Sequence, residues 1–161
     1  MHALTEPLMD IDFARAAWLW SLLLVVLTIS VHATGVVTVA LANVRMRAWL
    51  EGRDLGLRYL IPTIIAVIAT IGMLLALLHW IEAAIWAAVY LRLGALDSPA
   101  DAILYSVDSM ATRGASGLTL RHGQMMGALE AANGNLLFGL STAYIFTVML
   151  MYWPLLRRRA G

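Results

Sequence analysis

Three long apolar runs constrain what this chain can fold into more than any other feature. The first, Leu19 to Val44, and the core of the third, Ala131 to Tyr152, contain no Asp, Glu, Lys or Arg. The second, 59–93, is also long enough to cross a bilayer, although it contains Glu82. Backbone inside a bilayer must satisfy its own hydrogen bonds, so runs of this length cross it as helices. With 61% apolar residues and a mean hydropathy of +0.80, the 161-residue chain is predicted to be a single all-α integral membrane domain with three transmembrane helices.

The stretch 98–120, between the second and third runs, is too short and too polar to be a further span. Ser98 is a predicted N-cap, Pro99 suits the first helical position, and Asp101 favours the positive end of a helix. From there to about Ala111 a helix would measure roughly 20 Å, whereas a hydrocarbon core is about 30 Å thick. The small residues that follow are Gly114, Ala115, Ser116 and Gly117. This pattern predicts a re-entrant helix and loop, which at membrane depth must be buried in protein or line a watery cavity.

Arginine-rich segments indicate how the spans are oriented. Four arginines lie in the predicted loop 45–58, and Arg157 to Arg159 lie near the end of the chain. Short arginine-rich loops stay cytoplasmic, and three spans with one re-entrant loop place both segments on that side. We therefore expect a multi-pass protein of the inner (plasma) membrane, with the N-terminus outside and the C-terminus cytoplasmic. The expected segments are an external leader (1–15), a first helix (16–44), a cytoplasmic loop (45–58), a second helix (59–93), the pore helix and loop (98–120), an inner helix (124–156) and a cytoplasmic tail (157–161).

Small and polar side chains share one face of the third run. Asn135, Gly139 and Thr142 recur at helical spacing, and Phe146 continues the same face one turn later. This face indicates either a wet cavity or close packing between helices, and Gly139 is a candidate hinge. In a wet cavity these residues would face water, whereas close packing would place them against a neighbouring helix.

The histidines do not predict a metal site. The four histidines lie on separate elements, and His79 with Glu82 supplies only half of a site, so neither a metal nor a cofactor is expected. His32, in the middle of the first run, is expected to form a hydrogen bond between helices. A net charge of +1 gives no support for nucleic-acid binding, and membrane lipid is the expected surrounding.

The sequences AILYSVDSMATRG and GALEAANGNLLFGLSTAYIF resemble those of small bacterial potassium-channel-like proteins, a pore-loop ion-channel family. The resemblance covers roughly 79–147 and includes the order helix, pore helix, filter-like turn and helix. It implies a homotetramer around a central pore, with permeant ions as ligands and a filter that reads approximately T-x-G-Y-G-D. The matching residues are Thr112 and Gly114 in the filter, Ser106 and Ser109 on the pore helix, and Glu130, Asn133 and Gly134 at the start of the inner helix.

The departures from that pattern lie in the filter itself. Arg113 stands where a small apolar residue is usual, and Ala115, Ser116 and Gly117 replace tyrosine, glycine and aspartate. Potassium filters replace hydration water with rings of backbone carbonyls, so these changes predict altered or low potassium selectivity. Like charges at a pore repel unless they are partnered, and we expect Asp108, five residues earlier, to pair with Arg113 within or between subunits. The alternative is that Arg113 extends to the outer mouth of the pore and Asp108 faces water. Asp108, Ser109 and Glu82 are the expected filter-supporting residues.

Two other functions are compatible with the sequence. A channel-like protein that does not conduct could serve as a structural or regulatory subunit, and the altered filter favours that alternative. The motif Gly114 to Gly117 also matches the nucleophile motif of rhomboid intramembrane serine proteases, in which Ser116 would need a nearby histidine. The short motif is a weak signal, so the sequence predicts an ion channel rather than an enzyme.

Overall fold

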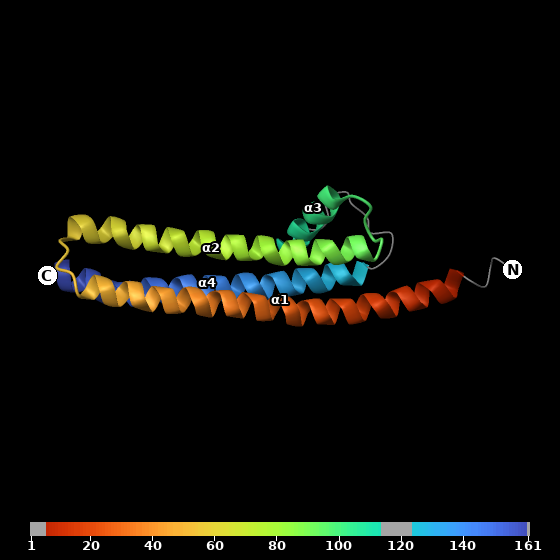
Figure 1. Cartoon of the computed structure of the whole chain (residues 1–161), viewed down its shortest axis with the longest axis horizontal. Coiled ribbons are helices and arrows are strands. Elements are labelled where there is room, and N and C mark those ends of the chain that lie inside the picture. The colour runs from red at the N-terminus through yellow and green to blue at the C-terminus, as the bar shows by residue number, and fades with distance from the viewer. Residues whose placement is uncertain (1–5, 114–123, 161) are drawn as a thin grey trace. The chain divides into compact units, whose positions relative to one another are not determined.

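The computed structural model describes the backbone of residues 6–113 and 124–160, and four helices lie in these ranges (Figure 1). The helices are α1 (Glu6–Glu51), α2 (Leu57–Arg92), α3 (Pro99–Met110) and α4 (Gln124–Ala160). The predicted all-helical class is confirmed for these ranges.

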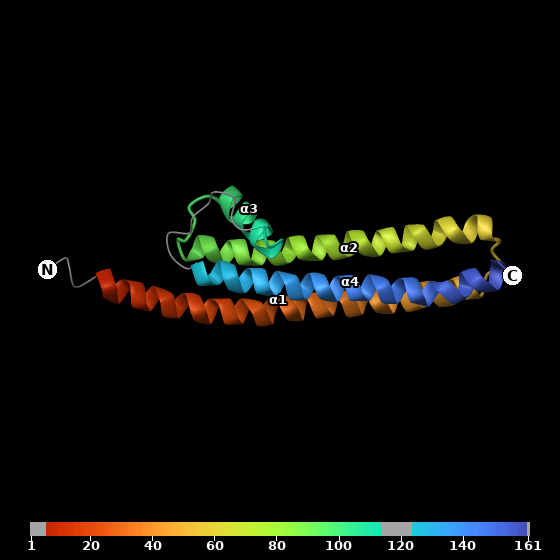
Figure 2. The same cartoon turned by 180° about the vertical axis from the view of Figure 1, so that it is seen from behind.

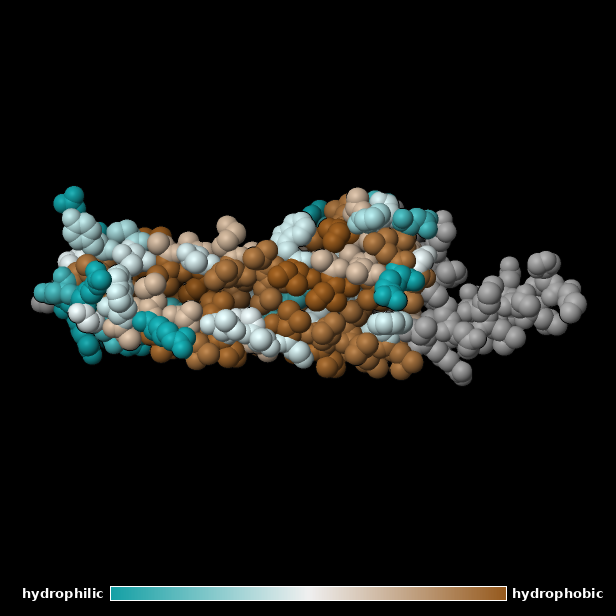
Figure 3. Space-filling view, viewed as in Figure 1, coloured by the Kyte–Doolittle hydropathy of each residue, from teal (hydrophilic) through white to brown (hydrophobic). Residues whose placement is uncertain are grey.

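Three of the helices are long and apolar enough to cross a membrane, as predicted. The candidate spans are Ala17–Glu51, Leu57–Arg92 and Met125–Arg159. Large apolar side chains are exposed along all three helices, among them Leu23, Leu77 and Leu150, and apolar residues cover much of the surface in Figure 3. Such surfaces are unfavourable in water and suit contact with lipid. The chain therefore has the composition and helix lengths of a multi-pass membrane protein.

The chain divides into two compact units, which are described separately. Unit 1 comprises Met1–Val31 and Trp80–Leu137, and unit 2 comprises His32–His79 and Phe138–Gly161. Unit 1 thus contains α3 together with one part of each long helix, and unit 2 contains the remaining parts of the three long helices.

The core of unit 1 contains a group of aromatic side chains and includes the inner face of α3. Trp86 and Tyr90 of α2 are fully buried, and the Tyr90 ring meets the Tyr105 ring edge to face at 5.2 Å. Gly127 of α4 provides the space for the Tyr105 hydroxyl, because a Cβ atom there would collide with it. Figure 2 shows α3 beside α2 and α4. The short helix is therefore an integral part of the core of this unit.

The core of unit 2 is aliphatic, with a polar contact between α1 and α4. The Tyr152 hydroxyl donates to Asn43 Oδ1 over 2.6 Å, and both side chains are buried. At the end of the same unit, Arg159 bonds the Asp54 carboxylate and donates to the Arg53 carbonyl over 3.1 Å. These contacts place the loop after α1 and the C-terminal turn of α4 at one end of unit 2.

Several predicted helix boundaries are wrong because the helices are longer than expected. Residues 45–51, predicted as loop, continue α1, and Arg47 pairs with Glu51 one turn later at 2.9 Å. Charged residues at this spacing support a helix rather than end it, and the break comes only at Gly52. The backbone of 6–15, predicted as leader, is also helical, and α4 includes Arg157 to Arg159 of the predicted tail.

The predicted start of α3 is confirmed, and α2 ends at Arg92, one residue before the predicted end. Ser98 caps α3, with its Oγ accepting from the Asp101 amide over 3.4 Å, and Pro99 is the first helical residue. Gly94 has a φ of +66°, and the amides of Gly94 and Ala95 donate back to Leu91 and Tyr90, which is a Schellman arrangement. Local chemistry therefore determines both ends of the connection between α2 and α3.

Candidate functional site

A buried polar network fixes α3 between α2 and α4 in unit 1. Ser106 Oγ lies 2.8 Å from the Ala83 carbonyl of α2 and also hydrogen-bonds the Glu130 carboxyl of α4. The Tyr90 hydroxyl donates to the other Glu130 oxygen over 2.7 Å. Ser106, Glu130 and Tyr90 have no exposed surface. Leaving buried polar groups unpaired is costly, so this network favours one position of the short helix.

The C-terminal end of α3 lies directly against α4. A Cβ atom added at Gly134 would lie 2.6 Å from the Met110 carbonyl oxygen and 2.7 Å from the Met110 Cα. Only glycine permits this approach without a shift of backbone. Ser109 and Asp108, in the last turn of α3, are both buried. Tyr105, one turn earlier, is also buried, and its own burial raises the pKa of its hydroxyl.

Asp108 and Arg113 form the predicted ion pair within one chain. Arg113 Nη1 lies 3.5 Å from Asp108 Oδ1, and the Arg113 amide donates to the Asp108 carbonyl over 2.9 Å. The Asp108 side chain is 4% exposed, whereas that of Arg113 is 72% exposed. Between them, Thr112 has a φ of +57°, an unusual conformation for a β-branched residue. The chain therefore turns sharply after α3. The Arg113 side chain is exposed, and the buried Asp108 carboxylate pairs with its guanidinium.

The remaining filter-like residues lie outside the described part of the chain. These are Gly114, Ala115, Ser116 and Gly117, which also make up the protease-like motif. Of the predicted filter residues, the structure places Thr112 and Arg113, together with Asp108 and Ser109, which were predicted to support the filter. Glu82, the third residue predicted to do so, is fully buried on α2 in unit 1.

The small and polar face of α4 is not covered by the rest of the described chain. Asn135 in unit 1 is exposed, and so are Gly139, Thr142 and Phe146 in unit 2. A Cβ atom at Gly139 would meet nothing within 4 Å. Helix packing within one chain therefore does not explain this face, which leaves a wet cavity or contact with another molecule.

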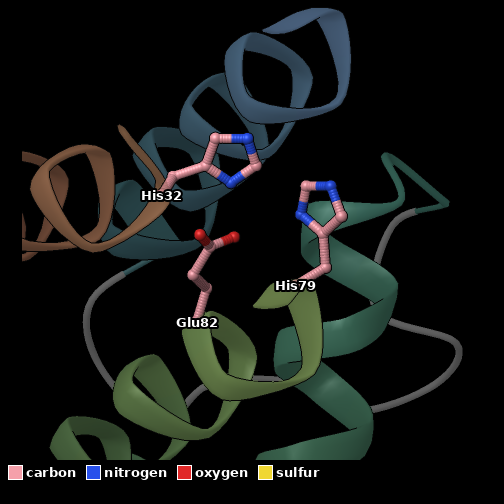
Figure 4. A group of neighbouring side chains, drawn as sticks. All are labelled: His32, His79 and Glu82. Atoms are coloured by element: carbon pink, nitrogen blue, oxygen red, sulfur yellow. The ribbon is translucent and has the colours of Figure 1, made fainter. Parts of the chain in front are cut away.

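The structure brings two histidines together in unit 2, which the sequence did not predict. Ser141 Oγ of α4 lies 3.2 Å from Nε2 of His32 and 3.2 Å from Nε2 of His79. The two imidazole rings are 5.1 Å apart, and His79 stacks on Phe138 at 4.1 Å (Figure 4). The predicted interhelix hydrogen bond of His32 is confirmed. The available signal was that both histidines lie within long apolar runs.

Comparison with protein-family models, curated proteins and solved structures gives no significant match for this chain. Its function is therefore inferred from its residues and their geometry.

Proposed function

We propose that this chain is the subunit of a tetrameric pore-loop ion channel in which α3 is the re-entrant pore helix. The observation that carries the proposal is the placement of α3 in unit 1. A helix of 12 residues, about 18 Å long, is packed among helices that are long enough to span a membrane. Its Ser106 bonds groups of both α2 and α4. A helix that is too short to cross, yet is held by buried polar contacts to candidate spans, suits a loop that enters and leaves on one side.

The exposed face of α4 supports assembly around a central pore. Asn135 and Thr142 are polar and exposed in the single chain. Polar side chains on a membrane helix are unfavourable against lipid and are found facing a bundle interior or a water-filled cavity. In a closed ring of four copies this face would line the pore. Gly139 would be a hinge, and Phe146 would be the bulkiest of the four residues that face the pore.

The charges at the end of α3 support altered selectivity. The carbonyl end of a helix favours cations. Arg113 opposes that effect, and four copies would place a ring of exposed arginines beside the filter-like loop. Each arginine is partnered by Asp108 of its own chain, which reduces their mutual repulsion. The channel is therefore expected to conduct with changed or low potassium selectivity.

Two basic segments at one end of unit 2 support the expected orientation of the chain in the membrane. Arg159 contacts Asp54 and the Arg53 carbonyl, so the loop between α1 and α2 and the C-terminal turn of α4 lie at one end of that unit. Short arginine-rich segments stay on the cytoplasmic side. We therefore assign both to the cytoplasm, and the N-terminus to the outer side of the inner (plasma) membrane.

Ion flux through purified protein in liposomes tests this function. Gradients of potassium, sodium and chloride are compared for the natural chain, for Arg113→Ala, and for Arg58→Ala as a control that removes an exposed arginine from unit 2. The expected result is flux whose ion preference changes with Arg113→Ala and not with Arg58→Ala. Absence of flux from a folded tetramer would overturn the proposal and favour the non-conducting structural or regulatory subunit.

A further inference from the structure

We propose that His32 and His79 bind a divalent transition-metal ion of the Zn²⁺ type. This site is distinct from the α3 region and does not depend on ion conduction. It rests on the geometry of two imidazoles in unit 2, and it can be tested by metal binding alone.

The two imidazoles converge on one point. Each Nε2 lies 3.2 Å from Ser141 Oγ, and a ring nitrogen of His32 and one of His79 lie within 4.8 Å of each other. Figure 4 shows both rings projecting from their helices toward the same space. Two nitrogens that share a tetrahedral Zn²⁺ at about 2.0–2.1 Å are about 3.4 Å apart. The rings would therefore need to approach by at most about 1.4 Å, with Ser141 turning aside.

The Ser141 hydroxyl, which lies between the two imidazoles, can turn away from them at little cost in free energy. A serine on a helix can hydrogen-bond the carbonyl one turn earlier in its own helix, so Ser141 has an alternative acceptor. His32 is fully buried and the His79 ring is held against Phe138. The metal would therefore meet ligands whose orientations are already restricted, which lowers the entropy cost of binding.

The donor set selects the class of metal. Imidazole suits Zn²⁺, Cu²⁺ and Ni²⁺, whereas Ca²⁺ and Mg²⁺ prefer oxygen ligands. The sequence contains no cysteine, so thiolate ligands are excluded.

The test uses the full chain, purified in detergent, with Zn²⁺ and Co²⁺ as probes. Equilibrium dialysis measures the binding of Zn²⁺, and visible absorption of Co²⁺ reports whether its coordination is tetrahedral. Variants His32→Gln and His79→Gln keep polar side chains but remove a ligand, and each should weaken binding at least about tenfold. The matched controls are His2→Gln and His122→Gln, which remove the other two histidines and should leave binding unchanged. Ser141→Ala keeps both imidazoles and should also bind.

A second measurement separates a metal site from a purely structural contact. Zn²⁺ should raise the thermal unfolding midpoint of the natural chain and of Ser141→Ala, but not that of His32→Gln or His79→Gln. If the folded natural chain binds neither Zn²⁺ nor Co²⁺, the proposal is wrong. Equal binding by the natural chain and both ligand variants would also overturn it. Either result would leave the histidines with a structural role, as hydrogen-bonding partners of Ser141.

Discussion

Gly134 of α4 lies against the backbone of Met110 at the end of α3, where an added Cβ atom would be 2.6 Å from the Met110 carbonyl oxygen. This contact and the Ser106 network, one helical turn earlier, both hold the C-terminal half of α3, so together they determine where the chain leaves α3. The filter-like residues follow directly after that point. The position of the proposed pore loop therefore depends on a glycine and a serine that lie in two different helices.

Gly134→Ala is expected to destabilise the chain by about 1–3 kcal/mol, because the added methyl group meets backbone rather than a flexible side chain. Thermal unfolding in detergent micelles measures the effect. The matched control is Gly72→Ala on α2, where an added Cβ meets nothing within 4 Å and the change should be neutral or stabilising. Equal midpoints for the two variants would contradict the close approach of α3 and α4.

Ser106→Ala is expected to lower the free energy of unfolding by about 1–3 kcal/mol, since Glu130 and the Ala83 carbonyl each lose a buried hydrogen bond. Chemical denaturation in mixed micelles provides the measurement. Thr147→Ala serves as the control, because its exposed hydroxyl only bonds a carbonyl one turn earlier in its own helix and its loss should cost about 0.5 kcal/mol or less. A Ser106→Ala effect no larger than that of the control would show that the network does not fix α3.

The Asp108–Arg113 pair is expected to contribute little to stability despite its position. Because the Arg113 side chain is 72% exposed, a double-mutant cycle with Asp108→Asn and Arg113→Gln should give a coupling below about 1 kcal/mol. The coupling should decrease further as salt is added. A much larger, salt-independent value would mean that Arg113 is buried in the assembled protein.

Gly94→Ala is expected to destabilise the chain by about 1–2 kcal/mol, because a φ of +66° is unfavourable for any residue with a Cβ atom. The control is Gly56→Ala in the turn before α2, where the added Cβ also meets open space but φ is not positive. Comparison of the two thermal midpoints separates backbone strain from crowding. A neutral Gly94→Ala would show that the turn between α2 and α3 can adopt another conformation.

The helices and their caps could be predicted because their causes are local. Long uncharged runs determine the candidate spans, and Ser98, Pro99 and Gly94 determine where α3 begins and α2 ends. The predicted boundaries near residues 45–51 and 157–160 are wrong because the prediction treats an arginine-rich segment as a loop. At those positions an Arg47–Glu51 pair and the contacts of Arg159 stabilise helix instead. Charge indicates on which side of a membrane a segment lies, but it does not end a helix.

Local patterns in the sequence are enough to predict the all-helical class, the three candidate spans and the short helix between the second and third. They also predict the Asp108–Arg113 pair, whose residues are five positions apart. The contacts between residues that are distant in the sequence appear only in the folded chain. Ser106 with Glu130, Met110 with Gly134, and His32 with His79 around Ser141 all join different helices. Helical periodicity predicts the face of the helix on which a residue lies. It does not predict which other helix packs against that face, or at which position along that helix the contact falls. That choice results from side-chain packing and from the satisfaction of buried polar groups across the whole chain.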